Sequence, residues 1–329
     1  MRGWRVRAPA LRSCRSATGL RRCAAYPGRV RWTSAIDGFR LCYNRAGTGG
    51  AAVLLHGWPG DRSEYRGVVA RLPAMDVVVP DLRGFGASDW RSGDPTSYGA
   101  DAQARSVVGL IEELGLDRPV VAGHDIGSRI AIAIARLRPD LIRALVLTPP
   151  LPGMGERILG PQAAPEFWYL SFNQLPLAVE LLDGRPDAMR VFLRHFWTHW
   201  AGPGFEPPDG HLDHLVSVYS QPGRAAALLG WYRTGVGALA RVAAERPPPP
   251  AERIAVPTTV LWPDRDPLFP PAWSDRLDQH FADLRLQHLS GIGHFVPMEA
   301  PDDFAEAVAA AGGTVRSPFG GGTGQRLAR

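Results

Sequence analysis

The stretch that most constrains the fold lies at residues 120 to 129, where an apolar strand runs directly into a helix through Gly-His-Asp-Ile-Gly. One glycine stands two positions before Asp125 and another two positions after it. Glycine at these places removes side chains that would collide in a tight strand-to-helix turn. We therefore expect Asp125 to stand above the end of a sheet, at a helix N-terminus whose partial positive charge favours an ionised, reactive carboxylate. An ordinary helix N-cap aspartate is the alternative interpretation.

Apolar strands and helical segments alternate on both sides of this turn. The sequence predicts helices at 98–114, 130–137 and 300–311, and strands at 36–43, 51–55, 76–79, 119–122, 141–147 and 258–261. Wholly apolar strands that alternate with helices are typical of a parallel sheet covered on both faces. The sequence thus predicts an α/β fold with a mostly parallel central sheet and flanking helices.

A segment of different composition interrupts the alternation. From Pro149 onward prolines, aromatic residues and histidines crowd the chain, with helical periodicity at 188–196 and 224–237, and four consecutive prolines at 247–250 end the segment. We interpret it as an inserted helical cap. The predicted organisation is a first part of the core at 34–148, the cap at 149–249, a second part of the core at 250–312 and a flexible tail at 313–329.

The basic residues are concentrated at the start of the chain. Nine of the 37 lie within residues 1–33, which hold no acidic residue, so the remaining 28 are outnumbered by 32 acidic residues. The body of the protein thus offers no basic face for nucleic acid. We expect residues 1–33 to be a disordered leader or the product of an early start-site assignment, with a transit peptide as the alternative.

The cysteines and the apolar runs bear on where the protein works. Cys14, Cys23 and Cys42 follow no disulfide or metal-binding pattern, which favours a cytoplasmic protein with free thiols. Apolar runs are strand-sized and shorter than the roughly 18 to 20 residues of a membrane-spanning helix. We therefore expect no membrane association.

Two further polar groups follow the central turn at positions where a catalytic triad needs them. Asp264 and Asp266 come after the apolar strand at 258–261, and His294 lies in a late loop before the final helix. Loops at strand ends can bring side chains together that are far apart in sequence. The order Asp, Asp, His makes Asp125, His294 and one of the two later aspartates candidate catalytic residues.

With these residues the chain resembles the Asp-nucleophile branch of the α/β-hydrolase superfamily, the epoxide hydrolases and hydrolytic dehalogenases. The resemblance covers about residues 35–312. It rests on five motifs, which are His56-Gly57-x-Pro59, Arg83-Gly84-x-Gly86-x-Ser88-Asp89, the Gly-x-Asp125-x-Gly turn, Asp266 and Gly293-His294. It implies an α/β-hydrolase fold with an inserted cap.

The resemblance also implies a role for each residue. Asp125 would attack carbon to form an alkyl-enzyme ester, and His294, polarised by Asp266, would activate the water that hydrolyses it. Asp266 is preferred because the family's acid usually occupies the second position of such an Asp-x-Asp pair. The backbone N–H groups of Trp58 and Ile126 would form the oxyanion hole. His56 is interpreted as a buried histidine that braces this loop.

The cap distinguishes an epoxide from a carbon–halogen bond. Tyr232 resembles the second of two cap tyrosines that donate hydrogen bonds to the epoxide oxygen. At the expected place of the first tyrosine stands Trp168, with Tyr169 next to it, and an indole N–H there could instead bind halide. Ile126 replaces the arginine or tryptophan that follows the nucleophile in dehalogenases. Epoxide hydrolysis is favoured, with haloacetate or haloalkane dehalogenation and a non-enzymatic binding protein as alternatives.

The aromatic cap predicts a small hydrophobic substrate, and its candidate contacts are Trp168, Tyr169, Phe172 and Trp231. We expect no cofactor, and a monomer or homodimer. The cap histidines suggest a metal site at first sight, but no HExxH motif or carboxylate partner accompanies them, which favours packing. These histidines are His195, His199, His211 and His214.

Overall fold

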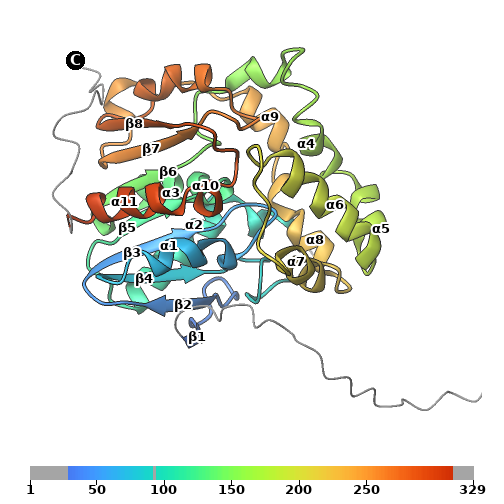
Figure 1. Ribbon diagram of the computed structural model, residues 1–329, viewed down its shortest axis with the longest axis horizontal. Helices are drawn as coiled ribbons and strands as arrows, with labels where there is room; N and C mark the ends of the chain where they lie inside the picture. Colours follow the sequence, from blue (N-terminus) through green and yellow to red (C-terminus); the bar gives the residue numbers. More distant parts are fainter. Residues whose placement is uncertain (1–28, 92–93, 314–329) are drawn as a thin grey trace, which may run out of the picture.

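The computed structural model describes residues 29–91 and 94–313, and its centre is an eight-stranded sheet in the order β1-β2-β4-β3-β5-β6-β7-β8 (Figure 1). The pairs β1–β2 and β2–β4 are antiparallel, and the other neighbours are parallel. The predicted mostly parallel sheet is confirmed. The strands are β1 (Arg29–Trp32), β2 (Cys42–Ala46), β3 (Gly50–Leu55), β4 (Met75–Pro80), β5 (Val120–Gly123), β6 (Ala144–Leu147), β7 (Thr258–Pro263) and β8 (Leu284–Leu289).

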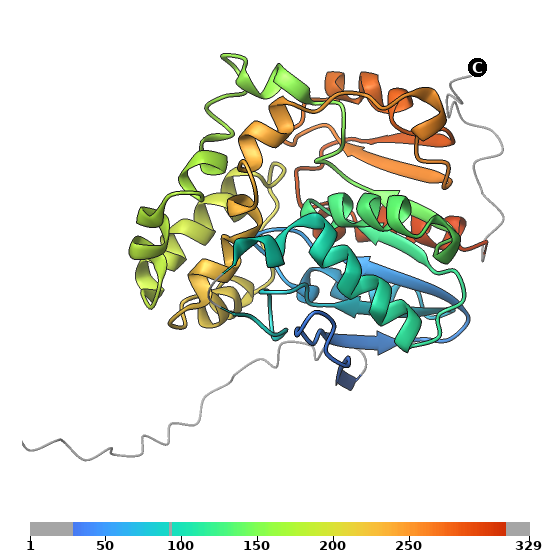
Figure 2. The same ribbon diagram turned by 180° about the vertical axis from the view of Figure 1, so that it is seen from behind.

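Helices cover both faces of the sheet, which is why β5 and β6 are buried along their whole length. On the face toward the viewer in Figure 1 lie α1 (Arg66–Ala70), α10 (Val296–Glu299) and α11 (Pro301–Ala311). The opposite face, seen in Figure 2, carries α2 (Ala100–Glu113) and α3 (Ile126–Leu137). Two separate clusters of buried apolar side chains fill the spaces between the sheet and these helices.

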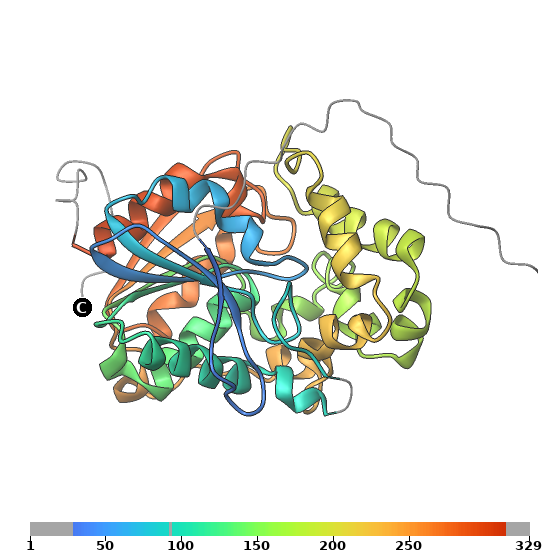
Figure 3. The ribbon, with the colours of Figure 1, turned by 90° about the horizontal axis from the view of Figure 1, so that it is seen from below.

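The chain between β6 and β7 is helical and gathers on one side of the core (Figure 3). We refer to this helical segment as the cap. Its helices are α4 (Trp168–Phe172), α5 (Pro176–Leu182), α6 (Pro186–His199), α7 (His211–Tyr219), α8 (Arg224–Leu228) and α9 (Ala238–Ala243). Short 3-10 helices complete the described chain: η1 (Arg62–Tyr65), η2 (Pro95–Tyr98), η3 (Pro139–Leu141), η4 (Gly155–Leu159), η5 (Gly230–Arg233), η6 (Pro250–Glu252) and η7 (Pro271–Gln279).

The two ends of the sheet differ from the prediction. β1 lies within the predicted leader and forms the outer strand of the sheet, and β8 was not predicted because it contains no continuous apolar run. The strand predicted at 36–43 begins only at Cys42, since Asp37 and Gly38 have φ of 50° and 80° and form a tight turn. Residues 1–28, with Cys14 and Cys23, and 314–329 of the predicted tail lie outside the described residues.

Among residues 29–91 and 94–313, no helix has both the length and the apolar character that a bilayer crossing requires.

Candidate active site

Asp125 occupies a strained turn between β5 and α3, with φ of 52° and ψ of −122°. The two flanking glycines are required by close backbone contacts. A Cβ atom on Gly123 would lie 2.5 Å from the carbonyl of Gly127, and one on Gly127 would lie 2.1 Å from the carbonyl oxygen of Leu55. The Asp125 carboxylate makes no capping hydrogen bond to α3, unlike an N-cap aspartate. The turn instead holds the carboxylate above the sheet.

The three residues predicted as a triad lie together. One Asp125 oxygen, Oδ2, is 3.4 Å from Nε2 of His294, and Nδ1 of His294 is 2.7 Å from Oδ2 of Asp266. The other oxygen of Asp266 accepts the N–H of Leu268 at 2.8 Å, which fixes the carboxylate. Asp264 points elsewhere, and its Oδ1 accepts the N–H of Gly291 at 2.7 Å. The contact with His294 therefore belongs to Asp266, as the resemblance implied.

The charge of His294 is set by the two carboxylates. Burial by itself lowers the pKa of this imidazole, but the charges and hydrogen bonds of Asp266 and Asp125 outweigh burial and raise the pKa to about 10. At neutral pH the site thus contains an imidazolium between two carboxylates. Removing the charge of Asp125 removes part of what keeps His294 protonated.

Trp58 supplies a backbone donor to the turn, because its N–H donates to Oδ1 of Asp125 at 2.8 Å. His56 braces this loop as predicted: Nδ1 donates to the carbonyl of Gly57 at 2.8 Å, and Nε2 accepts the N–H of Leu82 at 3.0 Å. Complete burial lowers the pKa of His56 to about 4, so the ring is neutral. Ile126, whose N–H is the second predicted donor, is the first residue of α3 and lines the cavity described below.

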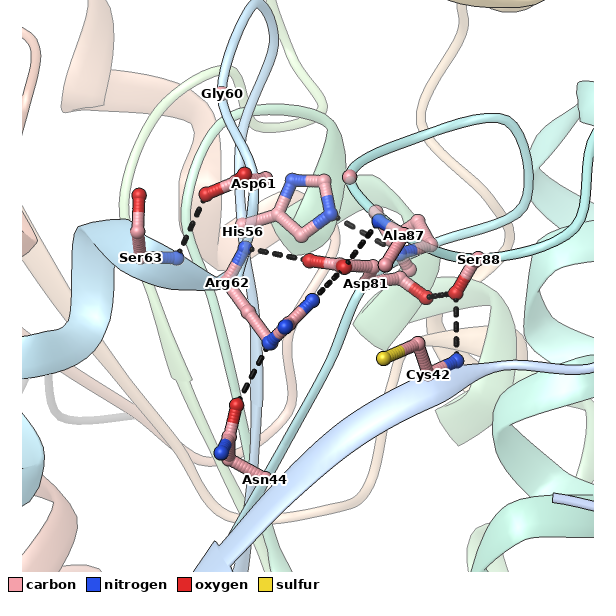
Figure 4. Close-up of polar contacts among 12 residues, drawn as sticks. Cys42, Asn44, His56, Gly60, Asp61, Arg62, Ser63, Asp81, Ala87 and Ser88 are labelled. Atoms are coloured by element: carbon pink, nitrogen blue, oxygen red, sulfur yellow. Dashed lines mark hydrogen bonds and ion pairs between the residues drawn. The ribbon is translucent and has the colours of Figure 1, made fainter. Parts of the chain in front are cut away.

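A buried polar network joins the loop after β3 to the loop after β4 (Figure 4). Asp81, which follows β4, accepts the N–H groups of Arg62 and Ala87 at 2.9 and 2.7 Å and pairs with the Arg62 guanidinium. Ser88 donates its hydroxyl to the Asp81 carbonyl at 2.6 Å. A Cβ on Gly86 would lie 2.2 Å from the Asp81 carboxylate, which explains this glycine of the Arg-Gly-x-Gly motif. These hydrogen bonds thus fix the loop after β3 against the loop after β4.

A cavity of about 880 Å³ opens between α3 and the cap, with Asp125 and Ile126 in its wall. Tyr169 and Tyr232 line it from the cap, with ring centroids 5.7 Å apart, and both contact Trp58 at 5.8 and 5.1 Å. Burial, together with the nearby Asp125 charge, raises the pKa of both phenols well above 10. They are therefore neutral hydrogen-bond donors beside the Asp125 carboxylate.

Two of the four predicted substrate contacts do not line the cavity, and this corrects the prediction. Trp168 is 42% exposed and packs on Phe172 with ring centroids 5.5 Å apart. The two residues stand four positions apart in α4 and therefore share one face, while Tyr169 points the other way into the cavity. Trp231 lines the cavity as predicted. Phe167, an aromatic residue of the cap, also lines the cavity, together with the apolar residues Met154, Leu170 and Phe269, which no sequence pattern distinguished.

The cap histidines have separate partners, and the expectation that no carboxylate accompanies them is wrong for two of the four. His199 pairs with Glu166 at 2.6 Å, and His214 pairs with Asp61 at 2.5 Å. His211 packs against the ring of Trp197 at 4.5 Å. Within residues 29–91 and 94–313, no group of three or more His, Cys, Asp or Glu side chains has an arrangement that could hold a metal ion.

Comparison with known proteins agrees with this fold. The profile of a family described as alpha/beta hydrolase fold matches residues 51–199, which include β3 to β6 and the Asp125 turn. The described sheet order and flanking helices match solved structures of the same fold. The chain has the α/β-hydrolase fold.

The relatives of this hydrolase are named for two reactions. It is 29% identical to the soluble epoxide hydrolase of Corynebacterium sp. over 81% of this chain and 91% of that protein. It is equally 29% identical to haloalkane dehalogenase 2 of Mycobacterium tuberculosis, over 86% of this chain and 94% of that protein. The ligand-free structure of the epoxide hydrolase CorEH superposes with a TM-score of 0.73 at 25% identity, covering 88% of this chain and all of that one. The protein is thus a hydrolase enzyme with the α/β-hydrolase fold.

Proposed function

We propose that the hydrolase opens a hydrophobic epoxide to a vicinal diol through a covalent ester on Asp125. The observation that carries the proposal is the presence of two neutral tyrosine hydroxyl groups, on Tyr169 and Tyr232, in the same cavity as the Asp125 carboxylate. A carboxylate can attack an epoxide carbon only if the oxygen that leaves is stabilised as it gains negative charge. Two phenols on the opposite wall are suited to that task.

In the first step Oδ2 of Asp125, the oxygen that does not accept the Trp58 N–H, forms a bond to one epoxide carbon while the bond between that carbon and the epoxide oxygen breaks. The oxygen takes its proton from Tyr169 or Tyr232, whose phenolate then recovers a proton from solvent. Oδ1 stays with the N–H of Trp58, 2.8 Å away. The carbonyl oxygen of the new ester therefore already lies in the oxyanion hole.

In the second step His294 acts as the base. Alkylation removes the negative charge of Asp125, which had helped to raise the pKa of His294 to about 10. The imidazole can then lose its proton, and neutral Nε2 can take a proton from water. The resulting hydroxide attacks the ester carbonyl carbon, and collapse of the tetrahedral intermediate breaks the bond from that carbon to the alkoxide oxygen of the substrate. The alkoxide takes the proton from Nε2 of His294 to complete the diol, and the Asp125 carboxylic acid returns its proton to the imidazole, which regenerates the carboxylate. Asp266 holds the imidazole throughout, from 2.7 Å.

Hydrolytic dehalogenation is the second candidate, because the same triad can displace halide and one relative is named a haloalkane dehalogenase. Departing halide needs N–H donors, but the indole N–H of Trp58 donates to the carbonyl of Leu228 at 3.2 Å. The Trp168 indole, which could have served that role, lies outside the cavity lining. The hydroxyl pair therefore favours an epoxide.

Mass spectrometry after incubation with an aryl epoxide tests the proposal. His294→Gln should retain an adduct on Asp125, whereas Asp125→Asn should form none. Diol formation by the unmodified enzyme should exceed halide release from matched chloroalkanes. An adduct on another residue, or halide release without diol formation, would refute the assignment.

A further inference from the structure

His294 stands on a loop between β8 and α10 whose backbone needs outside partners. The N–H groups on either side of it, those of Gly293 and Phe295, donate to the carboxylate of Glu299 at 2.7 and 3.0 Å. The N–H of His294 itself donates to the carbonyl of Trp200 at 2.8 Å. Three consecutive amides of the loop are thus held by one carboxylate and one residue of the cap.

The same carboxylate also holds the cap. Oε2 of Glu299, which accepts the N–H of Gly293, accepts the N–H of Gly202 at 2.9 Å as well. A Cβ on Gly202 would lie 2.6 Å from that oxygen, and one on Gly293 would lie 2.1 Å from the N atom of Gly202. Only glycines allow the two backbones to approach so closely. The cap segment Trp200–Gly202 and the His294 loop are therefore joined directly through Glu299.

The side chain of Trp200 continues this contact into the active site. The ring is 1% exposed and lies 5.0 Å from the His294 ring. It also lies 6.0 Å from Trp58 and 5.1 Å from Tyr169. One residue of the cap thus touches the base, the oxyanion loop and a wall of the substrate cavity.

We propose that Glu299 is a positioning residue for His294, which makes ester hydrolysis depend on the docking of the cap segment Trp200–Gly202. The inference rests on the proposed function, because it assigns Glu299 to the second step only. Attack by Asp125 uses its own carboxylate and the cavity tyrosines. Hydrolysis requires Nε2 of His294 and a water molecule in line with the ester carbonyl, and a displacement of about 1 Å in such a geometry costs up to about 10²-fold in rate.

The experiment separates the two steps in single-turnover reactions with an aryl epoxide. Glu299→Gln keeps the shape of the side chain but replaces one of its two acceptor oxygens with a donor. We expect the rate of ester hydrolysis to fall about tenfold or more while the rate of alkylation stays within about twofold, so that the Asp125 adduct accumulates. Intact-protein mass spectrometry measures the adduct, and quenched diol analysis measures its hydrolysis.

Asp183→Asn is the matched control. Asp183 is also a partly exposed carboxylate that accepts backbone N–H groups, those of Gly223 and Ala225, but it has no contact with the His294 loop. This variant should change neither step. If Glu299→Gln does not fold, Gly202→Ala pushes the cap segment away from an intact Glu299 and should also cause adduct accumulation.

Two results would overturn the inference: hydrolysis at the rate of the unmodified enzyme in both folded variants, or a parallel loss of alkylation and hydrolysis. The outcome with His294→Gln keeps this test apart from that of the proposed function. If His294→Gln retains no adduct, the ester mechanism itself is wrong. If His294→Gln retains the adduct and the folded Glu299 and Gly202 variants do not, only the positioning role fails.

Discussion

Replacing Gly127 with alanine tests whether steric contact, rather than backbone freedom, makes this glycine necessary. The added Cβ would lie 2.1 Å from the carbonyl oxygen of Leu55, whereas real Cβ contacts essentially never fall under 3.0 Å. The strand and helix must therefore separate by about 1 Å, and overpacking of this kind costs about 1–3 kcal/mol of unfolding free energy. The same shift moves the Asp125 carboxylate relative to His294, for which we expect a loss of about 10²-fold in activity.

Urea unfolding and the rate of Asp125 alkylation measure the two effects of Gly127→Ala. Gly67→Ala in α1 is the control, because its Cβ would meet no atom closer than the Pro301 side chain at 3.2 Å. We expect the control to keep its activity and to change unfolding free energy by at most about 1 kcal/mol. A Gly127→Ala protein with the stability and alkylation rate of the unmodified enzyme would show that the turn yields easily and that the steric argument is wrong.

Three further predictions concern charges and donors. Because the pKa of His294 is raised from 6.5 to about 10 in the folded protein, its stabilising effect should be complete below pH 6.5 and lost as pH rises toward 10. Urea unfolding at pH values across that range should show a smaller loss of unfolding free energy for Asp266→Asn than for the unmodified protein. An equal pH dependence of the unfolding free energy in the two proteins would contradict the ion pair between Asp266 and His294. Tyr232→Phe and Tyr169→Phe should each slow alkylation about 10²-fold in stopped-flow traces without slowing ester hydrolysis; an unchanged alkylation rate would remove that tyrosine from the mechanism. Asp81→Asn breaks a buried ion pair and should lower unfolding free energy by about 3–5 kcal/mol in urea, and a loss below about 1 kcal/mol would refute its bracing role.

The centre of the fold and part of the arrangement of Asp125, Asp266 and His294 could be predicted from the sequence because they depend on local patterns. The Gly-x-Asp125-x-Gly turn is dictated by contacts within a few residues of the chain and one neighbouring strand. Asp266 and His294 follow strands β7 and β8, and parallel strands bring the loops at their carboxyl ends to one edge of the sheet. Because β8 was not predicted and the choice of Asp266 over Asp264 came from the family resemblance, the strand pattern alone did not specify all three residues.

The lining of the cap cavity was harder to predict, because the sequence does not show which face of a short helix rich in aromatic residues points inward. In α4, Trp168, Tyr169 and Phe172 are all large enough to fill a pocket, and only the packing of the five-residue helix decides that Tyr169 faces Asp125. The contact of Glu299 with Gly202 joins residues 97 positions apart through backbone N–H groups, which leave no mark in side-chain patterns. Such contacts become visible only in three dimensions.

The outer strand β1 has a consequence for how the molecule meets its own copies. All four of its residues are exposed, and Arg29 and Arg31 alternate with Val30 and Trp32 along an edge that pairs with no other strand of the described residues. An unpaired edge is a template for intermolecular strand addition, and like charges on it oppose the pairing of two identical edges. A truncation that removes the chain through Trp32 would expose the edge of β2, which carries one arginine where β1 carries two. The truncated protein should therefore self-associate more during purification.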